Sequence, residues 1–443
     1  MELTRKLTRR ELLRGAALTV AAGALSGCAS LFKHPTPTPT PPPAQEKAKL
    51  IYARPAGQEF DLLGKAALSF NDTGLAPDVE VEDVALEGDP FARIIEMEAS
   101  GEPADVHLLT DETVPVWARQ GYILSLDPFL ADDTRFDLAD FYEQFLANSR
   151  FNGQLWALPW VCTPYFLFVN KDLFQAAGVS LPASSWTWED YKVAAIHLTN
   201  PEKNQWGGAP IDTFWQMGEH IWQNGGEVFN PDRTKCLLDQ PEATDALQFW
   251  ADLALADKAI PDATAKLGGS YRLFRSGQLA MYEDALYMVQ SWKDVPFKWT
   301  LAPAPQNRKA ANLLLAGSQV ISAHTRHTAA AWQLLKYVTG PEVLRTFSAA
   351  LRVPCARKSV NEKKPYIDPN IDIDWDLVQT GVQNGQLTEV TPNTGEVSSL
   401  LESLLKSIME GTQTIREAID KTVPQINDLI IEGWPQPTPT NEG

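Results

Sequence analysis

Segments with strand-type spacing alternate with segments of helical spacing from residue 49 onward. Repeated strand–helix–strand units predict a mostly parallel sheet that is covered by helices on both faces. The predicted strands are Leu50–Ala53, Val79–Val84 and Val106–Leu109, and the predicted helices are Phe60–Phe70, Phe91–Ala99 and a segment near Val114–Gln120. The sequence therefore favours an α/β fold.

The loops that follow two of these strands are candidate ligand-binding loops. Ligands bind outside the carboxyl ends of parallel strands. The loop after Ala53 offers Arg54, Gln58 and Glu59, and the loop after Leu109 offers Thr110 and Asp111.

The second half of the chain is richer in helical spacing. Thr187 followed by Asp190 three residues later predicts a capped helix start. Pro424 predicts a kink or break in the last helical segment. The predicted helices are Ala243–Ala256, Ala329–Thr339, Val397–Met409 and Ile415–Ile431.

The N-terminal residues predict export and a lipid anchor. Thr8–Arg14 is a twin-arginine pattern, and the apolar stretch Gly15–Gly27 is too short to cross a bilayer core of ~30 Å as a helix. Leu25-Ser26-Gly27-Cys28 resembles a bacterial lipobox, in which the cysteine is lipidated. We expect residues 1–27 to be a signal peptide and Cys28 to anchor the protein at the outer face of the cell membrane. The alternative is an N-terminal anchor helix with a buried cysteine.

A Pro/Thr-rich stretch follows this anchor, so residues 28–48 are expected to form an extended tether, and 435–443 a disordered tail. The mature body of roughly 390 residues exceeds one typical hydrophobic core, which predicts two domains.

Removing five basic and two acidic residues with the signal changes the formal charge from −18 to −21. Such a surface repels phosphates, so we expect no nucleic-acid partner.

Three cysteines remain beyond Cys28, namely Cys162, Cys236 and Cys355. An odd number of thiols cannot all pair within one chain. No C-x-x-C spacing supports a zinc or redox motif, and we expect no metal or cofactor.

Several motifs resemble family 1 extracellular solute-binding proteins, the maltose-binding-protein-like receptors of ABC importers. Phe168–Val179 (FVNKDLFQAAGV) matches best, although Val169-Asn170 stands where the family usually has Tyr-Asn. Other matches follow in the family's order: Gly101–Val106, Gln120–Asp127, Leu181-Pro182 with Trp186–Tyr191, Phe274–Met281, Ala329–Trp332, Gly340–Glu342 and Arg352–Pro354. The resemblance runs from about residue 50 to 431.

This resemblance implies a two-lobed periplasmic-binding-protein-like fold, in which each lobe is a mostly parallel sheet flanked by helices. Lobe 1 is expected at 49–158 and 303–353, and lobe 2 at 159–302 and 354–434. The chain would cross between lobes near Leu158–Pro164, Leu301–Pro305 and Leu351–Ala356, and the lobes would close on a ligand by hinge bending. Because Cys162 and Cys355 fall at two crossings, we expect them to lie close together, either as a disulfide or as two buried thiols.

The resemblance also implies a monomeric receptor that delivers a solute to an ABC transporter permease. A mono- or oligosaccharide needs flat aromatic surfaces and fixed polar groups, and the chain holds 14 tryptophans. Each predicted ligand-binding residue also has a structural alternative: a tryptophan can belong to the core, Asp111 can cap a helix and Arg352 can form an ion pair. Trp250 and Trp332 are assigned to the core. The predicted ligand-binding residues are Trp160, Tyr165, Trp215, Trp222, Tyr282, Asp284, Trp292, Asp111, Gly317 and Arg352.

Other functions have weaker support in the sequence. The motifs G-x-S-x-G, H-E-x-x-H and G-x-x-x-x-G-K do not occur, so we expect no enzyme, although sequence leaves a glycoside hydrolase open. Asp368, Asp372, Asp374 and Asp376 could form a solvated acidic loop or, less favourably, a calcium loop. A polyamine, a glycerol phosphate or another small solute is the alternative ligand, and a sensor or adhesin the alternative role.

Overall fold

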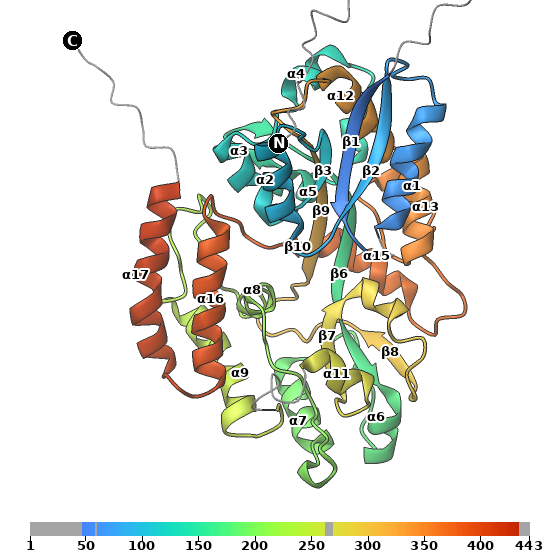
Figure 1. Cartoon of the computed structure of the whole chain (residues 1–443). Coiled ribbons are helices and arrows are strands. Elements are labelled where there is room, and N and C mark those ends of the chain that lie inside the picture. Colours follow the sequence, from blue (N-terminus) through green and yellow to red (C-terminus); the bar gives the residue numbers. More distant parts are fainter. Residues whose placement is uncertain (1–46, 58–59, 262–268, 434–443) are drawn as a thin grey trace, which may run out of the picture. The chain divides into compact units, whose positions relative to one another are not determined.

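The computed structural model describes residues 47–57, 60–261 and 269–433 (Figure 1). The predicted signal peptide, Cys28, nearly all of the tether, the tail, Gln58 and Glu59 lie outside the described residues. The strands are β1 (Ala48–Pro55), β2 (Val79–Leu86), β3 (Val106–Thr110), β4 (Arg150–Phe151), β5 (Gln154–Leu155), β6 (Leu158–Asn170), β7 (Met281–Ala285), β8 (Trp299–Ala302), β9 (Leu313–Ile321) and β10 (Gln386–Leu387).

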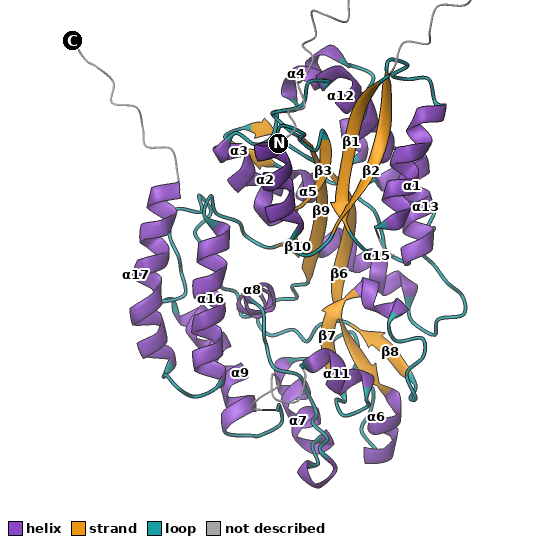
Figure 2. Ribbon diagram, in the orientation of Figure 1, coloured by secondary structure: helices purple, strands orange, loops and turns teal. Residues whose placement is uncertain are grey.

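Helices and the loops between them make up the remaining described residues, and the α-helices are the following (Figure 2). They are α1 (Asp61–Ser69), α2 (Pro90–Ser100), α3 (Val114–Gln120), α4 (Asp127–Asp132), α5 (Glu143–Asn148), α6 (Lys171–Ala177), α7 (Trp188–Leu198), α8 (Phe214–Gln223), α9 (Pro241–Leu255), α11 (Ser270–Arg275), α12 (Thr328–Val338), α13 (Pro341–Leu351), α14 (Lys358–Asn361), α15 (Trp375–Asn384), α16 (Thr394–Met409) and α17 (Ile415–Gly433).

The first strands confirm the predicted strand–helix alternation. β1 lies between β2 and β3 and is parallel to both. Alternate β1 residues point to opposite faces: Leu50 and Tyr52 pack with α1, α12 and α13, whereas Ala53 packs with α2 and α3. Both faces of this part of the sheet are therefore buried, as the apolar runs predicted.

One long strand, β6, joins the two parts of the eight-stranded sheet. Its first part pairs with β9, and its second part pairs with β7 and β8, always antiparallel. The expectation of a mostly parallel sheet in each lobe is therefore wrong for β6, β7 and β8. The chain leaves the first part of the sheet along β6 and returns along β8, so these two strands must run in opposite directions.

Residues 354–387 pack with elements that were assigned to lobe 1. β10 pairs with β9, and Arg357 and Ser359 bind the Asp140 carboxylate. Only α16 and α17 pack into the hydrophobic cluster that contains α7, α8 and α9. The lobe boundary placed at residue 354 stays a prediction.

Two helices test local predictions. α7 begins with the predicted capping box, in which Thr187 and Asp190 exchange side-chain and backbone hydrogen bonds. α17 runs from Ile415 to Gly433 with Pro424 inside it, so the predicted break does not occur. Burial of Ile419, Ile426 and Ile430 against the helical cluster stabilises this helix despite the missing backbone donor. None of the helices in the described residues is long and apolar enough to cross a membrane.

The two cysteines at the predicted crossings lie close together, as expected. Val161 and Cys355 form a bridge pair, and the Cys162 thiol donates to the Cys355 carbonyl at 3.3 Å. Both thiols are free and buried in the structure, as is Cys236. Burial raises the pKa of Cys162 well above its ordinary value and that of Cys355 to about 12, so both remain protonated.

Candidate functional site

A large cavity is built by three distant chain segments. It has a volume of about 410 Å³, in the range of pockets that hold small molecules. The segments are α5, the loop after α8, and the stretch from the end of α15 through β10. Their polar side chains at the cavity are Gln144, Asn148, Asn230, Arg233, Asn384, Gln386 and Glu389.

Pairing along β9 explains why these segments meet. Thr110 at the end of β3 pairs with Gly317, and Leu387 in β10 pairs with Leu314 further along the same edge. The carboxyl end of β3 therefore meets the residues that follow β10. The cavity wall adjoins this point, which is where ligands of parallel sheets bind.

Asn148 connects the three segments by hydrogen bonds. Its amide donates to the Asp111 carboxylate at 2.7 Å and to the Thr388 carbonyl at 3.0 Å. Its oxygen accepts from the Arg233 guanidinium at 3.3 Å. α5 ends at Asn148, and the chain then reverses in the β4–β5 hairpin, whose turn Asn152-Gly153 has positive φ at both residues.

Burial perturbs the charged groups around this cavity. It raises the pKa of Asp111 well above its ordinary value, with a further contribution from Glu112, whose own pKa is raised by burial. Burial, followed by repulsion from Glu227, raises the pKa of Glu389 to about 7. Burial also lowers the pKa of Arg233, although Glu389 and Asp111 oppose that change. Carboxyl groups thus outnumber the guanidinium group here.

The structure brings several predicted aromatic residues together in one cluster. Tyr165, Trp222, Ala285 and Leu313 form a small hydrophobic cluster against which Trp215 packs. Leu313 pairs with Gln386, which lines the cavity, but none of these aromatic side chains is among the residues that line it. We call Tyr165, Trp215 and Trp222 the aromatic cluster.

Tyr282 and Asp284 lie beside this cluster on β7. The Tyr282 hydroxyl donates a short hydrogen bond to the Asp284 carboxylate, which also accepts from the Ala285 N–H. Burial raises the pKa of Asp284 to about 6. Tyr287 follows them with 47% of its surface exposed, and it was not among the predicted residues.

Other predicted residues lie away from the cavity lining. Trp160 packs edge-on against Phe347 at 4.4 Å between ring centroids, and Gly317 leaves room for its indole. Trp292 is fully buried against Phe168 and Phe274. Trp222 is also enclosed, so in this conformation these three rings have no free face for a sugar. Trp250 and Trp332 are buried, as predicted.

Arg352 forms an ion pair with Asp368 at 3.4 Å, which was the alternative considered for it. Two further aspartates of the acidic loop also have partners, because Asp372 pairs with Lys171 and Asp376 with Lys364. Among the residues that the structure describes, no three His, Cys, Asp or Glu side chains form a group that could hold a metal ion.

Sequence reasoning missed Asn148, Arg233 and Glu389. The turn sequence Asn230-Pro231-Asp232 marks a loop, where binding residues often lie, and could have drawn attention to Arg233. No local signal indicates Asn148 or Glu389, because their roles depend on contacts between distant segments.

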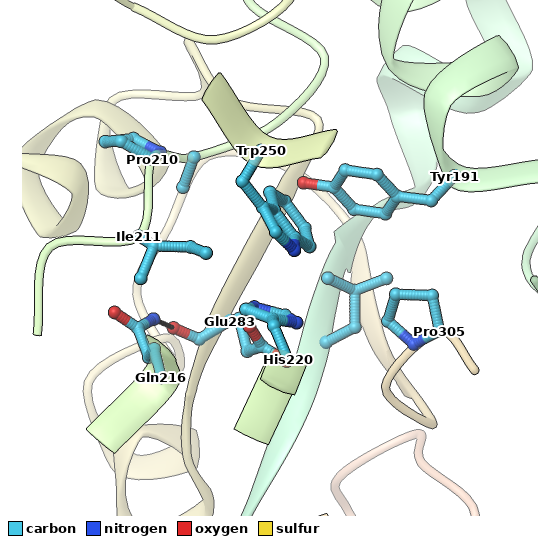
Figure 3. A pocket seen from close by; sticks show the side chains of 10 residues that line it. Tyr191, Pro210, Ile211, Gln216, His220, Trp250, Glu283 and Pro305 are labelled. Carbon is cyan, nitrogen blue, oxygen red and sulfur yellow. Dashed lines mark hydrogen bonds and ion pairs between the residues drawn. The ribbon is translucent and has the colours of Figure 1, made fainter. Parts of the chain in front are cut away.

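A second cavity lies between α7, α8, α9 and β7 (Figure 3). Its volume is about 10 Å³, which is the space of a single water molecule. Tyr191, Gln216, His220, Trp250 and Glu283 line it. It is too small for a solute, so its polar groups serve the protein interior.

A family model described as bacterial extracellular solute-binding protein matches residues 54–344. The mannitol-binding protein of Pseudomonas aeruginosa is 23% identical over 386 residues, covering 79% of this chain and 87% of that protein. Among solved structures, an ABC substrate-binding protein from Listeria monocytogenes in complex with cycloalternan is similar, with a TM-score of 0.77 and 24% identity over 88% of this chain and all of that one. A solute-binding protein from Thermotoga lettingae bound with α-D-tagatose has a TM-score of 0.73 and 18% identity, with 87% and 100% coverage.

Proposed function

The chain belongs to the bacterial extracellular solute-binding protein family, and from this premise we propose that it captures a carbohydrate in the cavity of about 410 Å³ and delivers it to an ABC transporter permease. The family consists of binding proteins, which confirms the expectation that the chain is not an enzyme and sets the glycoside hydrolase aside. The fold is the expected periplasmic-binding-protein fold.

The amide-rich lining of the cavity carries this proposal. An amide offers two donors and an acceptor oxygen, and a sugar hydroxyl both donates and accepts. Such planar groups can bind hydroxyls without adding net charge. The five amide side chains are those of Gln144, Asn148, Asn230, Asn384 and Gln386.

The aromatic cluster and the relatives add support. Trp215 is only partly buried, and an indole face suits the C–H face of a sugar. A mannitol-binding relative and structural neighbours that hold cycloalternan and tagatose bind polyols or sugars. We propose the same ligand class here.

Delivery would take place outside the cytoplasmic membrane. We propose that the twin-arginine signal directs export and that Cys28 carries a lipid that holds the receptor at the outer face of the cell membrane. The Pro/Thr-rich segment would then let the monomeric receptor reach the permease.

A polyamine is the second candidate, because one observation favours it. Three carboxyl groups lie at or behind the cavity wall, namely those of Asp111, Glu112 and Glu389, and the Arg233 guanidinium is the positive group beside them. A cationic ligand would relieve their mutual repulsion.

Thermal unfolding with a ligand panel tests the proposal. The panel contains maltose, mannobiose, tagatose, mannitol, spermidine and glycerol 3-phosphate. A ligand present at 100 times its dissociation constant adds about 2.7 kcal/mol to the free energy of unfolding, which raises the melting temperature. A rise with a sugar or polyol that Asn148→Ala abolishes supports the proposal. A rise with spermidine alone replaces the carbohydrate by a polyamine.

A further inference from the structure

The wall of the cavity of about 410 Å³ carries one charged side chain of each sign. Of the described residues that line it, Arg233 and Glu389 are the two whose side chains can be charged, and the other polar side chains are amides. Whether the cavity favours a neutral or a cationic solute therefore depends on the balance between the guanidinium group and the carboxyl groups around it.

Two hydrogen bonds hold the Arg233 guanidinium group at the wall. Its Nη2 atom donates to the Asn148 amide oxygen at 3.3 Å, and its Nη1 atom donates to the Val390 carbonyl oxygen at 3.4 Å. Both acceptors are neutral. These bonds therefore fix the position of the guanidinium group but supply no negative charge to balance it.

Asp111 balances this charge from behind the wall. The Asn148 amide group that accepts from Arg233 also donates to the Asp111 carboxylate at 2.7 Å, so a single amide group separates the two charged side chains. Asp111 is 3% exposed, and a buried carboxylate is costly unless a positive group lies near it. Arg233 supplies that positive group.

Glu389 balances the same charge from the segment that follows β10. Its carboxylate accepts from the N–H groups of Val228 and Phe229, both at 3.1 Å, in the loop that leads to Arg233. It also precedes Val390, whose carbonyl oxygen binds the guanidinium group. Burial lowers the pKa of Arg233, and Glu389 is the stronger of the two carboxyl groups that oppose this change, so the two charges interact.

The backbone at Arg233 has a conformation that is unusual for an arginine. Its φ is 55°, in the left-handed region that favours glycine and asparagine. The Asn230 side chain holds this turn, because its oxygen accepts from the N–H groups of Thr234 and Lys235 at 2.7 and 2.9 Å. A strained residue at a cavity wall points to a role of its side chain in binding.

We propose that Arg233 is a resident counter-ion for the carboxyl groups of the cavity, and that it selects a neutral carbohydrate over a cationic solute such as a polyamine. The guanidinium group takes the place that a ligand ammonium group would otherwise fill, so the carboxyl groups offer a polyamine little further stabilisation. It also repels a second positive charge, whereas a sugar hydroxyl has no charge to repel. This specificity role rests on the proposed function.

Calorimetry with spermidine at low ionic strength and pH 8 tests this role on the full chain. Spermidine stays cationic at this pH, and Glu389, with a pKa of about 7, is mostly ionised. Two unit charges about 10 Å apart at an effective dielectric constant of about 20 change an affinity by more than tenfold. Arg233→Gln should therefore bind spermidine at least tenfold more tightly than the unsubstituted protein, and added salt should reduce this gain.

Three further variants separate the effect of charge from that of folding. Arg233→Lys keeps the charge and should bind spermidine as weakly as the unsubstituted protein. Arg233→Gly removes the charge and relieves the left-handed backbone, so it should show the same gain as Arg233→Gln and replaces that variant if it does not fold. Lys235→Gln is the matched control, because this exposed lysine lies in the same loop but does not line the cavity, and it should show no gain.

A damaged site loses affinity, so a gain of spermidine affinity supports the specificity role. Equal spermidine affinity in Arg233→Gln, Arg233→Gly and the unsubstituted protein would refute it, as would an equal gain in Lys235→Gln. The panel sugars and polyols are titrated into the unsubstituted protein alongside. If none of them binds, the proposed function fails, and the spermidine comparison still decides whether the Arg233 charge excludes cations.

Discussion

Replacing Asn148 by alanine should destabilise the protein and abolish ligand binding together. The substitution removes three hydrogen bonds, to Asp111 at 2.7 Å, to the Thr388 carbonyl at 3.0 Å and from Arg233 at 3.3 Å. A typical intramolecular hydrogen bond contributes about 1 kcal/mol net, so the expected loss is about 3 kcal/mol. It also leaves the Asp111 carboxyl group, which is 3% exposed, without this partner.

This loss should be measurable in both denaturant and heat. Unfolding entropy of about 2.1 cal/mol/K per residue gives about 0.8 kcal/mol/K for a body of roughly 390 residues, so the melting temperature should fall by about 4 °C. Urea unfolding of both proteins gives the free-energy difference directly, provided that the slope with urea is unchanged.

Gln144→Ala is the matched control, because Gln144 lies on the same helix and lines the same cavity. Its side chain makes one described hydrogen bond, to the Val382 carbonyl at 2.8 Å, so about 1 kcal/mol should be lost. If Asn148→Ala costs no more than Gln144→Ala, Asn148 does not connect the three segments energetically, and our account of the site is wrong.

Three further outcomes are expected. Gly317→Ala should destabilise the protein by about 2 kcal/mol in urea unfolding, because the added Cβ would lie 2.6 Å from Trp160 Nε1, and an unchanged midpoint would contradict this packing. A thiol reagent should find no reactive cysteine in the native chain from residue 47 onward and three after unfolding, whereas one after unfolding would reveal a disulfide. Burial raises the pKa of Glu389 from 4.5 to about 7 in the folded protein, so its contribution to stability should be complete below about pH 4.5 and lost as the pH rises through 7. Glu389→Gln should flatten the pH dependence of the free energy of unfolding between pH 5 and 8. A pH dependence identical to that of the unsubstituted protein would refute the assignment.

Local patterns predicted most of the elements in the first part of the chain. The apolar runs at Leu50–Ala53 and Val106–Leu109 became β1 and β3 because both faces of that sheet are covered by helices. The Thr187–Asp190 capping box was readable because both partners lie within one turn. Of the kink or break predicted at Pro424, the break does not occur, since tertiary burial of α17 outweighs a missing backbone donor.

The site was harder to predict, because its residues meet only after the sheet has formed. The predicted aromatic residues included Tyr165 and Trp215, which meet in one cluster, but also Trp292, which fills the core. Indole rings serve both purposes with the same local sequence. Asn148 and Glu389 acquire their roles from the end-to-end meeting of β3 and β10 along β9, and residue spacing carries no information about that contact.

The position of β9 in the sheet also governs how the chain can be synthesised and matured. β9 lies between β3 and β6 in the sheet, although it follows both of them in the sequence. The hydrogen bond between Tyr52 on β1 and Gln319 on β9 joins residues that are 267 positions apart. While the ribosome makes the intervening segment, one edge of β3 and one edge of β6 lack their native neighbour. Unpaired strand edges promote association between chains, and contacts this distant form slowly. Both edges therefore stay without their native neighbour until residue 321 has left the ribosome.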